Sequence, residues 1–497
     1  MKRLVAVAAA ALAIAGLQPA QAARPARDPD FLHVGPASGP ADLRQIVDGH
    51  GRSVILRGVN VNGLVDYRTP GLSPPYPISP EAYRHHDCPT DSRVTTAVPL
   101  CEADLDQIAA LGFDVLRLPV SWSLLEPNPG KLGRASFDRI AQVVGWARAR
   151  GLRVVIDLHQ DAWSKYVNGT GPCPPGSDPA KGEDGAPLWA SVHVTPACAF
   201  AGIKEVDAAV QESAQRFWLD LPAPDGVGLQ EHYAAVVTAL AKRFGNEPAV
   251  AGYELMNEPQ PGYLPGAMDG TELMSFQGKV VNAVVAALPH FRQLFFVEPG
   301  GTRNVTAART FVAPWSTYSS YPDVVYAPHV YTEVFTADTS GTVQTFDSDY
   351  TAAAGDARAL GLPLWVGEFG NDPHDDAHIL AQHYAHQDAL AIGGALWVWK
   401  EHGTWSAVAN PTRVRRISTA YPVATAGTLD TLTSDPFAGT LQITGHGQSQ
   451  APTIVVLPAP FTRTPRVSGA RLELTSTEGI RAALIYPTGG AWSVRIP

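Results

Sequence analysis

The sequence predicts a (β/α)8 barrel followed by a small all-β sandwich, and three observations support this. Between residues 53 and 399, eight short apolar segments alternate with segments of helical periodicity, which is the element order of such a barrel. The apolar segments are continuous rather than alternating, as strands buried on both faces of a sheet require. After about residue 410 the helical periodicity ends, and short segments rich in Val, Thr and Leu alternate with turn residues.

The elements can be assigned in chain order. The barrel strands are expected at 53–59, 113–118, 152–158, 250–255, 293–297, 324–327, 364–367 and 395–399. The helices are expected at 102–111, 137–150, 230–244, 274–288, 351–360 and 378–391, and the sandwich strands at 440–444, 453–457, 471–474, 482–485 and 491–496. An open doubly wound sheet, the rival architecture, would normally carry a glycine-rich turn after its first strand, where Asn60-Val61-Asn62 stands instead. We expect the barrel over 23–409 and the sandwich over 410–497.

The composition excludes several classes of protein. The 497 residues are 45% hydrophobic and 17% charged, which suits a packed globular chain and excludes a disordered one. A formal net charge of −10 argues against nucleic acid as a partner, because such binders rely on a basic field. The histidines and cysteines show no paired metal-ligand spacing, so we expect no metal and no organic cofactor. The sequence does not indicate the oligomeric state.

The first 22 residues have the features of a secretory signal peptide. Lys2 and Arg3 precede an apolar run over 4–17, and Ala20-Gln21-Ala22 offers small residues for cleavage. A transmembrane anchor would need about 20 apolar residues, and this run is shorter. Cleavage after Ala22 would remove two positive charges and change the net charge from −10 to −12. The protein is therefore expected to be secreted.

Export permits disulfide bonds among the four cysteines. Four cysteines allow three pairings, and sequence alone cannot choose between them. The local pairs Cys88–Cys101 and Cys173–Cys198 are favoured, because each would staple a long loop and reduce its entropy in the unfolded chain. These loops, over 60–100 and 161–229, follow the first and third strands, on the face where barrel enzymes form their sites.

Two strands run into a glutamate. The fourth is followed by Asn257-Glu258-Pro259, and the seventh by Glu368. Retaining glycoside hydrolysis needs two carboxyl groups about 5–5.5 Å apart, one to attack the anomeric carbon and one to protonate the leaving oxygen. We expect a raised pKa for Glu258, a lowered pKa for Glu368 and a bell-shaped rate profile on the acidic side of neutral. A separation of more than about 8 Å would exclude this mechanism.

Other strand ends supply groups that suit a sugar site. Arg117 could keep the nucleophile ionised, and Asn257 could bind a sugar 2-hydroxyl. His159 ends the third strand with Asp161 beside it, His329 and Tyr331 could orient the two glutamates, and Trp399 could offer a flat face to a pyranose ring.

Some neighbouring residues are better explained by structure alone. Asp157 and Glu254 lie within strands, and Trp365 and Trp397 are expected in the core. Glu298 follows the fifth strand and is the main rival carboxylate.

The motifs LRLPVSW, DLHQD, LMNEP, APHVY and WVGEFG together resemble glycoside hydrolase family 5 over roughly residues 50–405. Within the family, DLHQDAWS and TAYPVATAG look most like endoglycoceramidases and related glycosylceramidases, which cleave the bond between glycan and ceramide. The resemblance implies Glu258 as acid/base and Glu368 as nucleophile. It implies a supporting shell of seven residues: Arg117, His159, Asp161, Asn257, His329, Tyr331 and Trp399. The loop over 60–77 has no lysine where such ceramidases are expected to touch the sugar, and Asp66 lies near that place, so a different sugar is expected.

The sequence leaves the substrate open between alternatives. Apolar side chains after the fourth and fifth strands could form an acyl-chain surface or could equally cover helices: Tyr263, Leu264, Met268, Phe311, Val312 and Trp315. The sandwich could contact a membrane surface or glycan, although a buttress for the barrel is slightly favoured. The alternatives to a ceramide glycosidase are a β-glucanase or exo-β-glucosidase acting on sterol or aryl glucosides, and a non-catalytic carbohydrate-binding barrel.

Overall fold

The computed structural model describes most of the chain. The ranges are 30–66, 80–89, 99–167, 172–179, 182–192, 198–200, 204–263, 271–306, 308, 313–332, 345–401, 405–447, 450–477 and 480–497. The expected signal peptide at residues 1–22 lies outside them. Within these ranges, none of the helices combines the length and apolar composition needed to cross a bilayer.

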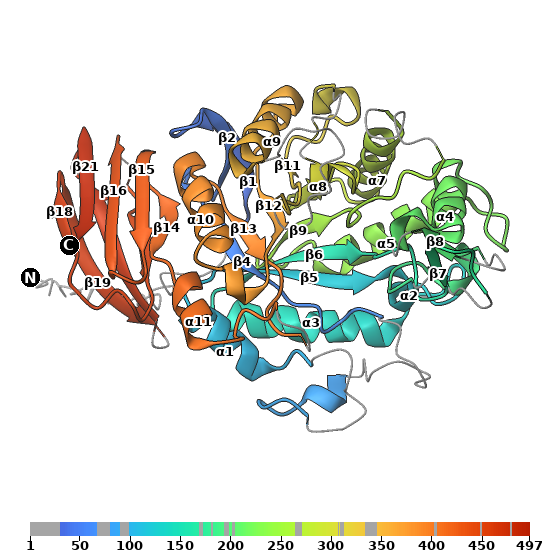
Figure 1. Ribbon diagram of the computed structural model, residues 1–497. Helices are drawn as coiled ribbons and strands as arrows, with labels where there is room; N and C mark the ends of the chain where they lie inside the picture. Colours follow the sequence, from blue (N-terminus) through green and yellow to red (C-terminus); the bar gives the residue numbers. More distant parts are fainter. Residues whose placement is uncertain are drawn as a thin grey trace, which may run out of the picture.

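Eight parallel strands form the predicted barrel (Figure 1). They follow the order β11-β10-β9-β6-β5-β4-β13-β12, and bridges from Tyr326 to Leu364 and from Val330 to Phe369 join the two edges. The strands are β4 (Arg57–Asn60), β5 (Val115–Ser121), β6 (Arg153–His159), β9 (Val250–Glu254), β10 (Leu294–Val297), β11 (Val324–Tyr326), β12 (Val366–Phe369) and β13 (Gly394–Leu396). The eighth strand ends three residues earlier than predicted, so Trp399 lies beyond it.

The six predicted helices are all present and pack their apolar sides into the core that surrounds the barrel. They are α1 (Glu102–Ala110), α3 (Arg134–Ala149), α5 (Leu229–Phe244), α7 (Leu273–Ala287), α9 (Phe346–Leu360) and α10 (Ile379–Leu390). Helix α9 begins five residues before its predicted start, because the Thr345 side chain accepts a hydrogen bond from the Ser348 N–H and caps the first turn. The sequence did not predict the short helices α2 (Trp122–Leu125), α8 (Arg303–Thr306) and α11 (Pro411–Ile417).

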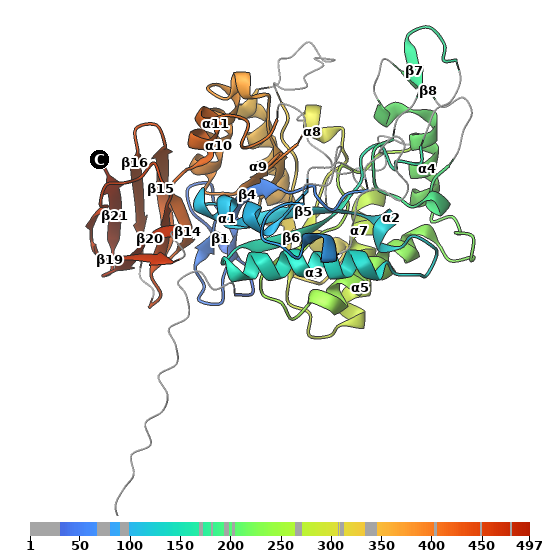
Figure 2. The same cartoon turned by 90° about the horizontal axis from the view of Figure 1, so that it is seen from below.

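The sandwich consists of two antiparallel sheets, in the orders β1-β2-β3-β14-β17-β20-β19 and β15-β16-β21-β18 (Figures 1 and 2). The strands are β1 (His33–Ser38), β2 (Leu43–Val47), β3 (Ser53–Val54), β14 (Tyr421–Thr425), β15 (Thr428–Asp435), β16 (Thr440–His446), β17 (Thr453–Leu457), β18 (Arg466–Ser468), β19 (Ala470–Thr477), β20 (Ile480–Pro487) and β21 (Ala491–Ile496). Three of them come from the N-terminal side of the barrel, and β3 pairs with β14. The expected barrel range of 23–409 is corrected at its start, because the strands over 33–54 extend the sheet of the sandwich.

The predicted first strand, 53–59, divides between the two domains. Ser53 and Val54 pair with the sandwich, whereas β4 pairs with the barrel strands β5 and β13. Between them, Ile55 packs into the sandwich core and Leu56 into the barrel interior. Such a short, fully packed connection supports the expectation that the sandwich buttresses the barrel.

Disulfide bonds tie both long loops, and they are the two local pairs that the sequence favoured, Cys88–Cys101 and Cys173–Cys198. The loop after β6 also contains elements that the sequence did not predict, namely β7 (Ser177–Pro179), β8 (Cys198–Phe200), the 3-10 turn Lys204–Val206 and α4 (Ala208–Trp218). The Asp207 side chain caps α4 by accepting hydrogen bonds from its first turn. Figures 1 and 2 both show this insertion at the end of the molecule away from the sandwich.

Candidate active site

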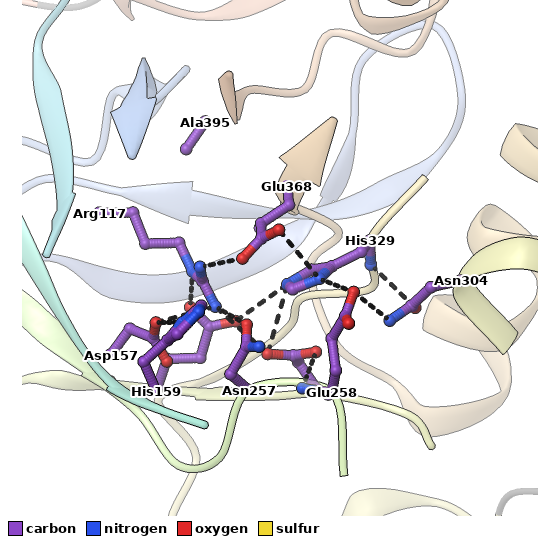
Figure 3. Close-up of polar contacts among 12 residues, drawn as sticks. Arg117, Asp157, His159, Asn257, Glu258, Asn304, His329, Glu368 and Ala395 are labelled. Atoms are coloured by element: carbon purple, nitrogen blue, oxygen red, sulfur yellow. Dashed lines mark hydrogen bonds and ion pairs between the residues drawn. The ribbon is translucent and has the colours of Figure 1, made fainter. Parts of the chain in front are cut away.

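The two predicted glutamates converge at the carboxyl ends of the barrel strands. Glu258 follows β9, and Glu368 lies in β12 (Figure 3). A carboxylate oxygen of each and one ring nitrogen of His329 all lie within 4.8 Å of one another. This spacing agrees with the predicted convergence and matches retaining hydrolysis, because the inverting mechanism separates its carboxyl groups by about 6.5–9.5 Å.

Arg117 lies at the centre of the site and is fully buried. Its Nη1 is 2.5 Å from Oε1 of Glu368, and its Nε is 2.5 Å from Oε2 of Glu254. The same guanidinium donates hydrogen bonds to the side-chain oxygens of Asn60 and Asn257, each at 2.8 Å. The planar guanidinium of Arg117, on β5, therefore fixes the candidate nucleophile on β12 relative to groups at the ends of β4 and β9.

His329 and Asn304 bind the other glutamate. His329 Nδ1 lies 2.8 Å from Oε1 of Glu258, and Asn304 Nδ2 donates to the same oxygen at 3.2 Å (Figure 3). His329 Nδ1 is also 3.7 Å from Oε2 of Glu368, which accepts a hydrogen bond of 2.8 Å from the Tyr331 hydroxyl. The imidazole thus lies between the two candidate catalytic groups.

The main chain at Glu258 adopts an unusual conformation. Its φ of +39° lies in a region that residues with a Cβ rarely occupy. The Gln160 side chain donates to the carbonyl oxygens of Asn257 and Glu258, each at 2.8 Å, and the Glu258 N–H donates to Oε2 of Glu298 at 3.1 Å. Buried side chains therefore hold the turn that presents the Glu258 carboxylate.

The pKa shifts of the two glutamates run opposite to the expectation. Burial alone would raise the pKa of Glu258, but hydrogen bonds from His329 and Asn304 lower it. Burial raises the pKa of Glu368, although His329 and Arg117 oppose this. The prediction was wrong because the sequence does not show that His329 and Asn304 reach Glu258 from distant parts of the chain.

His159 contacts Asp157 on one side and Trp397 on the other. Its Nδ1 lies 2.7 Å from Oδ2 of Asp157, and its ring stacks on the Trp397 indole with centroids 5.6 Å apart and planes 10° apart. Burial opposes the imidazolium charge, but Asp157 raises the pKa of His159 to about 9. His159 is therefore cationic at neutral pH, and Asp157 has the structural role that the sequence suggested.

The expectation that Trp399 offers a flat face to a sugar is wrong. Trp399 is 2% exposed, and its indole N–H donates to Asp104 at 3.1 Å, so it presents no free face to a sugar. Trp397 was expected in the core, yet it is only partly buried and stacks on His159. Trp365 is fully buried, as predicted.

The remaining predicted residues bind protein groups at the edge of this network. Asn257 donates to the Gln160 carbonyl at 3.0 Å, and its amide nitrogen carries a second N–H. Asp161 Oδ2 lies 2.6 Å from Nζ of Lys204, and this ion pair is separate from the contacts between Glu258 and Glu368. Asp66 is buried, and its carboxylate is 2.5 Å from Lys165 Nζ. The loop after β6 thus supplies a lysine close to the loop over 60–77, which has none.

The predicted acyl-chain surface is only partly described. Tyr263 is 54% exposed, in agreement with an open apolar surface. Trp315 is 4% exposed and packs in the core, so including it was wrong. Leu264, Met268, Phe311 and Val312 lie outside the described residues.

Sequence reasoning missed three amides that organise the site. Asn60 ends β4 and could have been found by inspecting every strand end. Gln160 stands inside the DLHQD motif, next to two residues that were noticed. Asn304 lies a few residues after Glu298, on the short helix α8, and no sequence signal identified it.

The grouping of acids and histidine resembles a metal site only superficially. Glu258, His329 and Glu368 offer three atoms within 4.8 Å, and so do Glu254, Glu298 and His329. However, the Arg117 guanidinium is already 2.5 Å from both Glu254 and Glu368. A divalent ion there would face this cation, so the geometry favours Arg117 as the counter-charge of the carboxylates.

Comparisons with known proteins agree with this geometry. The family model described as "Cellulase (glycosyl hydrolase family 5)" matches residues 94–403. Endoglycoceramidase I of Rhodococcus hoagii (strain 103S) is 28% identical over 409 residues, which cover 78% of this chain and 73% of the relative. The crystal structure of an endogalactoceramidase superposes with a TM-score of 0.76 at 29% identity, covering 94% of this chain and 100% of the other. Endo-glycoceramidase II from Rhodococcus sp., solved as a lactosyl-enzyme intermediate, gives a TM-score of 0.70 at 25% identity, with coverages of 94% and 100%.

Proposed function

The chain belongs to the cellulase family, glycosyl hydrolase family 5, and from this premise we propose that it is a retaining β-glycosidase that releases the glycan of glycosphingolipids from ceramide. The observation that carries the proposal is the approach of Glu258 and Glu368 to within 4.8 Å around the buried Arg117. A non-catalytic barrel would have no use for such a pair.

The geometry supports a double displacement. In the first step, Glu368 bonds to the anomeric carbon while the bond from that carbon to the ceramide oxygen breaks, and Glu258 gives this oxygen its proton. In the second step, Glu258 takes a proton from water, the water oxygen bonds to the same carbon, and Glu368 is released. Hydrogen bonds from Arg117 and Tyr331 favour the ionised form of Glu368 and aim it at the carbon.

The pKa directions assign roles to the two limbs of the expected bell-shaped rate profile. The raised pKa of Glu368 sets the acidic limb, because this group must lose its proton to act as nucleophile. Nearby carboxylates hold the pKa of His329 well above its ordinary value, against the effect of burial, so the proton that Glu258 needs is available across a 2.8 Å contact. Loss of that proton from the Glu258–His329 pair sets the alkaline limb.

The substrate class rests on similarity together with one surface feature. Likeness to the endogalactoceramidase extends over 94% of this chain and so includes the sandwich as well as the barrel. The exposed Tyr263 supports an apolar surface beside the site. Because the matching family model is a cellulase model, a β-glucanase is the second candidate.

Export forms part of the proposal. It is supported by the signal-like N-terminus and by the two disulfide bonds, which form in oxidising compartments. Mass spectrometry of protein collected from culture medium should find Ala23 as the first residue. A chain that stays in the cytosol with Met1 retained would contradict this.

Substrate tests separate the two candidates. The purified chain is incubated with a ganglioside and, separately, with carboxymethyl-cellulose, and released sugar is measured. Glycan release from the ganglioside alone supports the proposal, whereas sugar release from the cellulose alone rejects it in favour of a β-glucanase. Inactivity on both, and on aryl β-glycosides, would reject hydrolysis altogether.

Variants test the two carboxylates. Glu258→Gln and Glu368→Gln should each lower kcat roughly 1,000-fold or more, whereas the exposed Glu473→Gln is the matched control and should have no effect. In alanine variants, added azide should yield a β-glycosyl azide when Glu258 is removed and an α-glycosyl azide when Glu368 is removed. Full activity in both glutamine variants would show that the carboxylates are wrongly assigned.

A further inference from the structure

Glu298 is a carboxylic residue at the base of the site that cannot contact substrate. It follows β10 directly and has no exposed surface. The Gln277 side chain donates to its carbonyl oxygen at 2.9 Å, which fixes its main chain. Burying a carboxyl group fully costs folding free energy unless hydrogen bonds or opposite charges compensate for it. The contacts of Glu298 therefore indicate its role.

The first contact is with the main chain of Glu258. Oε2 of Glu298 accepts a hydrogen bond of 3.1 Å from the Glu258 N–H, at the residue with the unusual φ of +39°. On the other side of this turn, a Cβ at Gly301 would come within 3.1 Å of the Glu258 carbonyl oxygen. The turn is therefore clamped between Glu298 and a glycine that permits close approach.

The second contact is with His329. Oε1 of Glu298 lies 3.3 Å from Nε2 of the imidazole, whose other nitrogen lies 2.8 Å from Glu258. Glu298 is thus the nearer carboxyl group at Nε2, with Glu254 at 3.9 Å, and Glu258 is the nearer one at Nδ1, with Glu368 at 3.7 Å. A group at Nε2 decides which way the ring faces and how its protons are distributed.

We propose that Glu298 is a positioning residue, which holds the Glu258 turn and the His329 ring together so that the ring directs its Nδ1 proton to the Glu258 carboxylate. This rests on the proposed function, in which Glu258 protonates the leaving group. Glu298 acts through these two groups and touches no reacting atom.

The charges around Glu298 agree with this role. It faces Arg117 at 3.4 Å, His329 and Glu258, and its side chain is hydrogen-bonded to that of Glu254. Burial and Glu254 raise the pKa of Glu298 well above its ordinary value, whereas burial of Glu254 is opposed by Arg117 and by hydrogen bonds with His329 and Glu298, which together lower the pKa of Glu254 to about 2. The raised pKa favours the uncharged form of Glu298, which supports His329 without drawing the catalytic proton away from Glu258.

The test compares Glu298→Gln with Glu298→Met. Glutamine keeps the neutral charge and an acceptor for the Glu258 N–H, so kcat should stay within about fivefold of the parent. Methionine has a similar size but no polar group, so kcat on an aryl β-glycoside with a poor leaving group should fall about 100-fold, with KM nearly unchanged and the alkaline limb shifted. On a dinitrophenyl glycoside, whose leaving group needs no proton, the loss should stay below about threefold. Equal losses on both glycosides, or no loss, would overturn the proposal.

A second measurement does not depend on activity. The ¹⁵N shifts of the His329 ring, read from the full chain labelled in histidine, should differ from the parent in Glu298→Met and match it more closely in Glu298→Gln. Unchanged shifts in Glu298→Met would overturn the proposal. If Glu298→Met does not fold, Glu298→Asp, which withdraws the carboxyl by one methylene, takes its place with the same expected pattern. A parent chain inactive on all glycosides would refute the proposed function, while the ring shifts would still decide the role of Glu298.

Discussion

Two buried arginines show how the two ends of the barrel differ. Arg117, at the carboxyl ends of the strands, faces Asp157, Glu254, Glu298 and Glu368 within 3.4 Å. Arg57, at the start of β4, pairs with the carboxylate of Asp388 on α10 and lies over the rings of Tyr384 and Tyr421. Both are at most 1% exposed. Arg117 therefore has more carboxylates around it than its charge can balance, whereas Arg57 pairs with one carboxylate that balances its charge.

This difference separates the end of the barrel that carries the proposed chemistry from the end where the buried ion pair contributes to the folded structure. Among the described residues of the site, three cationic groups face five carboxyl groups: Arg117, His159 and His329 against Asp157, Glu254, Glu258, Glu298 and Glu368. This excess of carboxyl groups favours protonation of some of them, in agreement with the raised pKa of Glu298 and of Glu368. The Arg57–Asp388 pair is neutral as it stands and contributes only to the folded structure.

The largest expected effect comes from replacing each arginine by lysine. Arg117→Lys keeps the charge but loses the planar fork that reaches Glu254, Asn257 and Glu368, so kcat/KM should fall on the order of 10³-fold. Arg57→Lys is the matched control and should leave kcat/KM of the folded protein unchanged. Equal activity losses in the two variants, measured on the same aryl glycoside, would remove the distinction.

The next largest expected effect is on the unfolding free energy, through the Arg57–Asp388 pair at the opposite end of the barrel. Arg57→Met leaves Asp388 buried without its partner, which should cost about 3–5 kcal/mol of unfolding free energy. The double variant Arg57→Met/Asp388→Leu should recover much of this loss, because no charge is left unpaired. Denaturant titration measures both. A double variant no more stable than Arg57→Met would mean that the rings and the helix, rather than the charge pair, determine stability here.

A pH experiment contrasts the site histidines with a core histidine. His383 is fully buried between α9 and α10, and burial lowers its pKa to about 3. Its folded pKa lies below the unfolded value of about 6.5, so its stabilising effect is complete above pH 6.5 and is lost as the pH falls toward 3. His159 has the opposite sign, because its pKa of about 9 gives stability that is complete below pH 6.5 and is lost as the pH rises through 9.

The contribution of His383 can be isolated by substitution. Between pH 7 and pH 5 it should account for about 2 kcal/mol of lost unfolding free energy. His383→Gln does not titrate, so its loss over the same interval should be smaller by that amount. Parallel pH dependences of the parent and the variant, from urea midpoints, would show that another group dominates.

The fold and the two catalytic candidates could be predicted because they depend on local patterns. Continuous apolar runs marked the strands, and Glu258 and Glu368 stood at their ends. Trp397 and Trp399 were confused because the choice depends on where β13 ends and which way each side chain then points. The sheet that joins β3 to β14 pairs Ser53 with Thr425, residues far apart in the sequence, and no local pattern reports such a pairing.

The electrostatics could not be predicted for a related reason. The pKa directions of Glu258 and Glu368 follow from their burial and from Asn304, His329 and Arg117, which reach them from other strands and loops. Glu298 follows a strand and was noticed as the main rival to the two chosen glutamates, but its lack of exposure was not visible in the sequence. Residue type and strand position suggested the participants, whereas burial determines what each one does.

The smallest effect tests what Tyr421 contributes beside Arg57. The Tyr421 hydroxyl donates to the Gly112 carbonyl at 3.1 Å and so connects β14 of the sandwich to the turn after α1. Tyr421→Phe keeps the ring under the Arg57 guanidinium but removes this hydrogen bond, which should cost about 1 kcal/mol of unfolding free energy without changing kcat. A cost near that of Arg57→Met would mean that the hydroxyl, rather than the charge pair, holds the sandwich on the barrel. A change in kcat would show that the two ends of the barrel are coupled, contrary to the separation drawn from the two arginines.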